Sequence, residues 1–133
     1  MKSKIYFADA RAKGYDYKYS FVAKFEQILN MIDFKEFISK KDYVAIKTHF
    51  GSYGGHRIVR PIFLRKVVEK VKEVGGKPFV TDTVRIQGLD YLEVANMEGI
   101  NHLSVGAPVI LADGIFGRDT VMVKSGPILK EIG

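Results

Sequence analysis

The chain of 133 residues contains no cysteine. This excludes a disulfide framework, a thiolate-ligated metal site and an iron–sulfur cluster held by cysteines of this chain. The sequence also lacks a run of roughly 18 or more apolar residues, the length that a transmembrane helix needs. The apolar stretch near the N-terminus, residues 5–8, is too short for a signal peptide. We therefore expect a cytoplasmic protein that does not enter a membrane.

The composition is that of one globular domain, which we expect to span residues 1–133. Hydrophobic residues make up 47% and charged residues 27% of the chain, close to the globular average. The net charge is +6, but Lys66 and Lys70 alternate with Glu69 and Glu73, which is typical of a solvated helix face. No helix-turn-helix pattern or arginine-rich tail is present, so we do not expect nucleic-acid binding. The abundance of lysine and glutamate is compatible with a thermophilic source.

The most regular pattern is an amphipathic helix that begins at Pro61. Proline suits the first helical position, and Gly75 and Gly76 supply a left-handed C-terminal cap. Its apolar stripe has helical spacing and consists of Leu64, Val67, Val68, Val71 and Val74. An apolar strand precedes the helix at residues 43–48, and another follows at 78–81. Together they predict a right-handed βαβ unit.

The fold class that we expect is α/β, with three layers and a mainly parallel sheet of four to five strands covered by helices on both faces. A first strand is predicted at residues 4–8 and a helix at 17–31, followed by a helical turn at 34–38. A short helix is predicted around residues 89–95, and a fourth strand at 108–112. Residues 120–124 are predicted to form an edge strand, as a hairpin partner across the turn at 114–118.

The segment from residue 43 to residue 61 carries the candidate binding site. Its strand ends in polar residues, and a glycine-punctuated loop with basic side chains follows. In open α/β sheets, ligands bind outside the carboxyl ends of the strands. Glycines let backbone N–H groups approach an anion, and the N-terminus of the next helix favours negative charge. The candidate ligand-binding residues are Lys47, His49, Gly51, Gly54, Gly55, His56, Arg57 and Arg60.

The spacing of these glycines matches neither a Walker loop nor the dinucleotide fingerprint. The loop is therefore interpreted either as a flexible lid over a site for a small anion or as a structural turn.

A divalent metal ion is the possible cofactor. Three predicted strands end near His49, Asp82 and Asp113, and parallel strands bring their carboxyl ends to one rim. An imidazole and two carboxylates can bind a metal ion or act as acid and base. Alternatively, Asp82 and Asp113 cap a helix or close a turn. No nucleophilic triad is visible, so whether the chain is an enzyme stays open.

The chain resembles the bacterial and archaeal family known as domain of unknown function 362. The motifs that carry the resemblance are IYFADARAKGYDYKYS, VAIKTHFG, VRP, GGKPFVTDT and VGAPVILADGIFGRD. Members of that family are often longer, and some carry ferredoxin-type iron–sulfur segments. The resemblance therefore implies an N-terminal α/β portion without the iron–sulfur segment. Lys47, His49, Gly51, Asp82 and Asp113 fall inside the shared motifs, but the family has no settled activity that would assign their roles.

The functional expectation is a metal- or small-anion-binding site at the C-terminal ends of the strands. The alternative is a non-catalytic interaction module that forms a homo-oligomer or pairs with a second protein chain. In that case the polar residues at the rim serve only as caps and turns.

Overall fold

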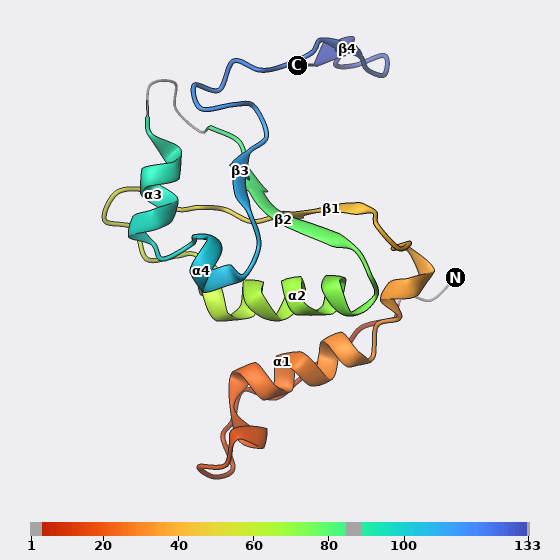
Figure 1. The fold of residues 1–133 in the computed structure, drawn as a ribbon, viewed down its shortest axis with the longest axis vertical. Coiled ribbons are helices and arrows are strands. Elements are labelled where there is room, and N and C mark those ends of the chain that lie inside the picture. The colour runs from red at the N-terminus through yellow and green to blue at the C-terminus, as the bar shows by residue number, and fades with distance from the viewer. Residues whose placement is uncertain (1–3, 85–88, 133) are drawn as a thin grey trace.

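The computed structural model describes residues 4–84 and 89–132. Its centre is a parallel sheet of three strands in the order β1-β2-β3 (Figure 1). The strands are β1 (Tyr43–Lys47), β2 (Lys77–Asp82) and β3 (Val109–Leu111). Tyr43 is in register with Lys77, and Val80 is in register with Val109. The prediction of an α/β fold with a parallel sheet is confirmed.

Helix α2 (Pro61–Glu73) connects β1 to β2 and begins at the predicted proline. Its buried residues are Leu64, Val68 and Val71, members of the stripe seen in the sequence. The helix ends in a Schellman motif, in which the Gly76 N–H donates to the Val71 carbonyl at 3.0 Å and Gly75 adopts a φ of +91°. Glycine is needed at position 75 because a Cβ is strained in that conformation.

The other helical elements surround α2. They are the 3-10 turns η1 (Tyr17–Tyr19) and η2 (Phe34–Glu36) and the helices α1 (Phe21–Asn30), α3 (Tyr91–Met97) and α4 (His102–Val105). The single helix predicted at residues 17–31 is divided at Ser20, because its side chain accepts the Ala23 N–H and starts α1 there. None of the helices in the described part of the chain is long and apolar enough to cross a membrane.

The core lies between the sheet and α2, α3 and α4. Its largest fully buried side chains come from all of these elements and from the loop after β1: Phe50, Val68, Val80, Tyr91, Val94, Ile100 and Val105. Burial of such side chains supplies the main stabilisation of a domain this size. The loop after β1 is thus anchored to the core at Phe50, which fixes where the candidate site begins.

The helices in the described part of the chain cover one face of the sheet and leave the other open. Figure 1 shows α2 between the sheet and α1, and α2 contacts both β1 and β2. On the second face, which we call the open face, the side chains of Tyr43, Ala45 and Ile110 are exposed. In the order β1-β2-β3 each strand follows its predecessor on the same side. Successive right-handed crossovers therefore place every connecting helix on the same face of the sheet. The expected third layer is therefore not observed among the described residues.

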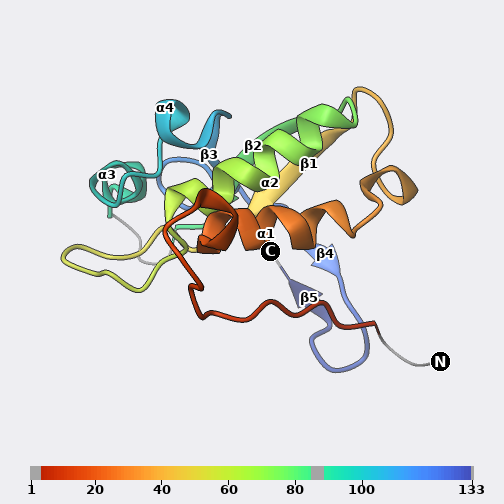
Figure 2. The same ribbon diagram turned by 90° about the horizontal axis from the view of Figure 1, so that it is seen from below.

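Two of the predicted strands differ from the structure. Residues 4–8 form no strand, and residues 123–124 pair away from the main sheet, so the described part of that sheet has three strands rather than four to five. Strand β4 (Val123–Lys124) is antiparallel to β5 (Glu131–Ile132), and Figure 2 shows this pair well apart from β1–β3. The observed hairpin therefore joins residues 123–124 to residues 131–132 and not, as predicted, to the strand before residue 114.

Candidate functional site

The loop from β1 to α2 lies beside α3, on the side of the sheet where β1 ends (Figure 1). Two tyrosines connect the loop to that helix. The Tyr91 hydroxyl is 3.2 Å from the Gly51 carbonyl, and the Tyr53 hydroxyl donates to Glu93 Oε2 at 2.9 Å. The first contact is buried and the second is exposed. The buried Tyr91 therefore holds the start of the loop from the core side, and Tyr53 holds it near its middle at the surface.

Asp82, at the end of β2, is the centre of the polar network at this rim. Asp82 is 5% exposed, and each of its carboxylate oxygens has a hydrogen-bond donor. The Phe50 N–H donates to Oδ2 at 3.1 Å, and the Thr83 N–H donates to Oδ1 at 3.0 Å. The Lys47 ammonium lies 3.2 Å from Oδ1, and the Tyr91 hydroxyl lies 3.2 Å from Oδ2. The buried charge is thus compensated on both oxygens, as burial of a carboxylate requires.

These donors also decide the ionisation of Asp82. Burial favours the neutral acid and by itself raises the pKa of Asp82. The backbone N–H groups of Phe50 and Thr83 and the ammonium of Lys47 stabilise the ionised form and outweigh burial. The pKa of Asp82 is therefore held below its usual range. Asp82 is an anion at neutral pH, and its environment is built to keep it so.

His49 is oriented by this anion and by Tyr91. Its Nδ1 lies 3.0 Å from the Tyr91 hydroxyl oxygen and 3.4 Å from Asp82 Oδ2. The Asp82 carboxylate can only accept, and the Tyr91 hydroxyl, which is within hydrogen-bond distance of Nδ1, Asp82 and Gly51, can accept as well as donate. We therefore assign the Nδ1–H tautomer. In the neutral ring Nε2 then carries the lone pair, and it is the nitrogen left to meet a ligand.

The half-exposed His49 ring lines a cleft, which we call the rim cleft. The cleft has a volume of about 570 Å³ and is lined by His49, Gly51, Ser52, Gly54, Gly55, His56, Arg57 and Ile58. This size is within the range of sites for small molecules. Its ionisable lining residues are two histidines and an arginine, with no carboxylate among them. The composition of the lining favours an anionic ligand.

The backbone of the loop depends on its glycines. Ser52 to Gly55 forms a turn in which the Gly55 N–H donates to the Ser52 carbonyl at 2.8 Å and Gly54 has a φ of +70°. A positive φ at the third turn position calls for glycine. At Gly55, a Cβ would come within 2.9 Å of the Ser52 carbonyl oxygen. The loop conformation therefore depends on a positive φ at Gly54 and on the absence of a Cβ at Gly55.

The structure brings some of the sequence candidates together and leaves others apart. Six of the eight candidate ligand-binding residues line the rim cleft: His49, Gly51, Gly54, Gly55, His56 and Arg57. Lys47 contacts Asp82 rather than the cleft lining. Arg60 immediately precedes α2 and is exposed outside the lining.

The candidate metal ligands do not form one ligand set. Both oxygens of Asp113 accept the Val84 N–H, at 2.9 and 3.0 Å, so this carboxylate links the chain after β3 to the chain after β2. His49 and Asp82 are neighbours, but both oxygens of Asp82 are already engaged by donors. Among the described residues no group of three or more His, Asp or Glu side chains could hold a metal ion. The described residues thus supply fewer protein ligands than the three of a catalytic zinc site or the four of a structural one.

Tyr91 is not among the site residues predicted from the sequence. The apolar pattern around it predicts a helix, and a tyrosine at the start of such a helix is read as a core residue. The ring is indeed buried against Phe50, with 5.6 Å between ring centroids, while its hydroxyl reaches the polar network. The sequence feature that could have located Tyr91 is Asp90, a helix N-cap residue that makes Tyr91 the first residue of α3. Only the fold shows that this helix end lies beside β1 and β2.

Comparison with known proteins gives a family but no closer relative. No curated protein and no solved structure matches the chain. The family described as domain of unknown function, DUF362, matches residues 44–133, about two-thirds of the chain. The match begins in β1 and includes the rim cleft, Asp82 and Tyr91. The chain therefore belongs to the DUF362 family, as its sequence motifs predict.

Proposed function

We propose that the protein binds a small oxyanion in the rim cleft and that His49 and Arg57 recognise it. The observation that carries the proposal is the orientation of His49. Its Nδ1 is held by Tyr91 and Asp82, so that Nε2 is the nitrogen available in a cleft that Arg57 also lines. A guanidinium is suited to the planar geometry of carboxylates and phosphates. The glycines of the loop allow close approach to its backbone.

The tautomer of His49 further restricts the ligand. In the neutral ring Nε2 accepts a hydrogen bond, so the best ligand combines negative charge with an O–H group. Hydrogen phosphate and small 2-hydroxy acids have both features, whereas sulfate lacks the O–H at neutral pH. The same geometry would allow Nε2 to act as a general base towards that O–H, with Asp82 stabilising the charged imidazole. We therefore rank acid–base chemistry on a hydroxylated anion as the reaction class, if the protein is an enzyme.

The test is thermal unfolding of the protein with phosphate, sulfate, small hydroxy acids, nucleotides and divalent cations. A ligand that binds only the folded state stabilises it by about 2.7 kcal/mol at a hundred times its dissociation constant. We expect phosphate or a hydroxy acid to raise the melting temperature, and sulfate to raise it less. A shift caused only by divalent cations would instead support the metal site.

Matched variants locate the site. Arg57→Gln should abolish the phosphate shift, whereas Arg60→Gln should not, because Arg60 lies outside the cleft lining. His49→Ala should remove the preference for phosphate over sulfate, and His102→Ala on α4 should leave it unchanged. Equal effects of the two variants within either pair would contradict the proposal.

A second candidate function is an interaction module that associates with itself or with another chain. The observation in its favour is the open face, where Tyr43 is 78% and Ile110 is 44% exposed. Apolar side chains gathered on one exposed face are typical of association surfaces. Sedimentation at increasing protein concentration tests this function, and a 15 kDa monomer throughout the range would exclude self-association.

A further inference from the structure

The outer edge of β1 has no neighbouring strand among the described residues, since the sheet order is β1-β2-β3. The Thr48 N–H donates to the Thr81 carbonyl on β2 at 3.0 Å. Because hydrogen-bonding directions alternate along a strand, the N–H groups of Ala45 and Lys47 point to the outer edge. A free edge of this kind is a template for a further strand.

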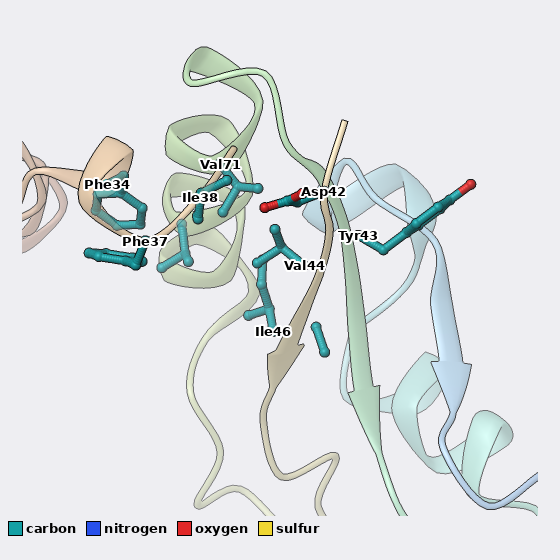
Figure 3. A pocket seen from close by; sticks show the side chains of 10 residues that line it. Phe34, Phe37, Ile38, Asp42, Tyr43, Val44, Ile46 and Val71 are labelled. Atoms are coloured by element: carbon teal, nitrogen blue, oxygen red, sulfur yellow. The ribbon is translucent and has the colours of Figure 1, made fainter. Parts of the chain in front are cut away.

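An apolar groove runs along this edge, and Figure 3 shows it from close by. Val44 and Ile46 reach from β1 into the groove, and Phe34, Phe37 and Val71 lie across from them. Its volume is about 530 Å³. The groove lies on the helix-covered side of β1, so it continues the core beyond the last strand.

Residues 4–8 have the pattern of a strand that would fit this edge. Exposure alternates along residues 5–8: Ile5 and Phe7 are 86% and 88% exposed, whereas Tyr6 and Ala8 are half-buried. In Figure 2 the segment runs from the N-terminus at the right towards the left, in the same sense as β1. Two large apolar side chains on one side of a five-residue segment are costly in water. The side of β1 that faces the groove likewise carries two apolar side chains, Val44 and Ile46.

The position of α1 indicates which chain supplies the strand. Helix α1 connects residues 4–8 to β1 and packs against α2, on the covered face of the sheet. A parallel strand beside β1, joined to it by a helix on that face, continues the direction of the existing order and gives a right-handed crossover. Helix α1 therefore already lies on the face where a right-handed crossover from residues 4–8 to β1 would place it.

We propose that residues 4–8 of the same chain dock in parallel on the outer edge of β1 as a fourth strand. Five residues meet the five residues of β1, with Ile5 opposite Val44 and Phe7 opposite Ile46. Both apolar side chains then enter the groove, and Tyr6 lies beside Ala45 on the open face. The Lys24 ammonium holds the carbonyl oxygens of Asp9 and Arg11, each at 2.6 Å, so the chain after residue 8 has an anchor on α1 about which the segment can move.

The docked strand would end at the same rim as β1, because parallel strands share their carboxyl edge. The free edge and the groove would be covered, and the sheet would gain the fourth strand that the sequence predicts. This inference does not depend on the proposed anion site, since it concerns the edge and the groove rather than the cleft.

Cross-linking tests the docking directly. The chain has no cysteine, so a disulfide can form only between introduced residues. Neighbouring strands lie about 4.8 Å apart, which is within the Cα separation that a disulfide spans. We expect Tyr6→Cys with Ala45→Cys to form an intramolecular disulfide. Tyr6→Cys with Ile110→Cys should not, because β3 would lie about 14 Å from the docked strand at that spacing.

Mass spectrometry and non-reducing electrophoresis distinguish the outcomes. Absence of the first disulfide, or equal formation of both, would overturn the proposal. A cross-linked dimer without the intramolecular product would also overturn it, since a second copy would then supply the strand.

Hydrogen exchange gives an independent measurement on the protein without cysteines. Docking should slow exchange of the Ala45 and Lys47 amides. Phe7→Asp should restore fast exchange there, whereas Phe116→Asp, at another exposed phenylalanine, should not. Fast exchange of both amides in the unmodified chain would contradict the proposal. Neither experiment uses a ligand, so a failure here leaves the anion-binding proposal standing.

Discussion

The hydroxyl of Tyr91 lies 3.0 Å from Nδ1 of His49. These residues are 42 positions apart in the chain, one at the start of α3 and the other after β1. The contact joins a fully buried tyrosine to a half-exposed histidine that lines the rim cleft, and it engages the Nδ1 side of the imidazole. The chemistry that we propose for the site depends on this relationship.

Tyr91→Phe should lower the free energy of unfolding by about 1 kcal/mol, the usual contribution of a buried hydrogen bond. The ring and its packing stay, while Asp82 and His49 lose a neighbour. Urea unfolding measures the stability, and ¹⁵N chemical shifts of the imidazole measure its tautomer. We expect the His49 tautomer to become mixed.

Tyr53→Phe is the matched control, because its hydroxyl bond to Glu93 is exposed. It should leave both measurements unchanged. A Tyr91→Phe protein with native stability and an unaltered imidazole would show that the hydroxyl does not orient His49.

The stability contributed by Asp82 should depend on pH in the acid range. Since the pKa of Asp82 is lower in the folded chain than the ordinary value of 3.8, ionised Asp82 favours the folded state. The contribution is fully present above 3.8 and is lost as the pH falls through the folded-state pKa. The difference in unfolding free energy between the wild type and Asp82→Asn should therefore shrink below pH 3.8. Denaturant unfolding at pH 7 and at acid pH would measure it, and a pH-independent difference would contradict this assignment.

Gly51→Ala should destabilise the protein more than Gly54→Ala. Both glycines have positive φ, at +101° and +70°, so alanine is strained at either position by about 1 kcal/mol. At Gly51 a Cβ would also approach Ile58 and Glu98 to 3.0 and 3.1 Å, whereas at Gly54 nothing lies within 4 Å. Thermal unfolding of the two variants isolates the packing contribution. Equal losses would mean that the loop yields at Gly51 and that its start is not held as the structure indicates.

Lys66 should stabilise the contact between α1 and α2. Its ammonium lies 2.7 Å from Glu26 on α1 and 3.0 Å from Glu69 on α2, and these hydrogen bonds raise its pKa. Lys66→Met should lower stability at neutral pH by about 1 kcal/mol. Because the folded pKa is raised, the contribution is present below the ordinary value of 10.5 and declines as the pH rises beyond it.

Lys70→Met is the control for that variant, since Lys70 pairs with Glu73 on the same helix. Its effect should be smaller by about half or more, as measured for pairs within one helix. Equal effects of the two variants would show that the link to α1 adds nothing.

Local patterns were sufficient for the elements whose signals lie close together in sequence. The stripe and caps of α2 predict its bounds, and the apolar runs predict β1, β2 and β3 to within about two residues. They failed where a segment needs a distant partner, as with residues 4–8 and 120–124. A strand pattern specifies alternation but not the neighbour that completes the hydrogen bonds.

The candidate site was likewise predictable from the sequence only in part. Lys47, His49, the loop glycines and Asp82 could be selected from the sequence, because polar residues at strand ends and glycine-rich loops have a physical meaning by themselves. The roles of these residues could not be predicted from the sequence. The fold places Asp113 against the Val84 N–H, Lys47 against Asp82 and Arg57 in the cleft lining, and it adds Tyr91 to the network.

Local sequence patterns were enough to predict that this chain is an α/β protein with polar residues where its strands end. Hydrophobic periodicity and turn residues act over a few positions, and they need no knowledge of distant contacts. Which of these residues meet, which face of the sheet stays open and which nitrogen of His49 contacts Tyr91 and Asp82 are visible only in the tertiary structure. Those features depend on crossover handedness and on side-chain geometry between segments far apart in the chain, which no local pattern encodes.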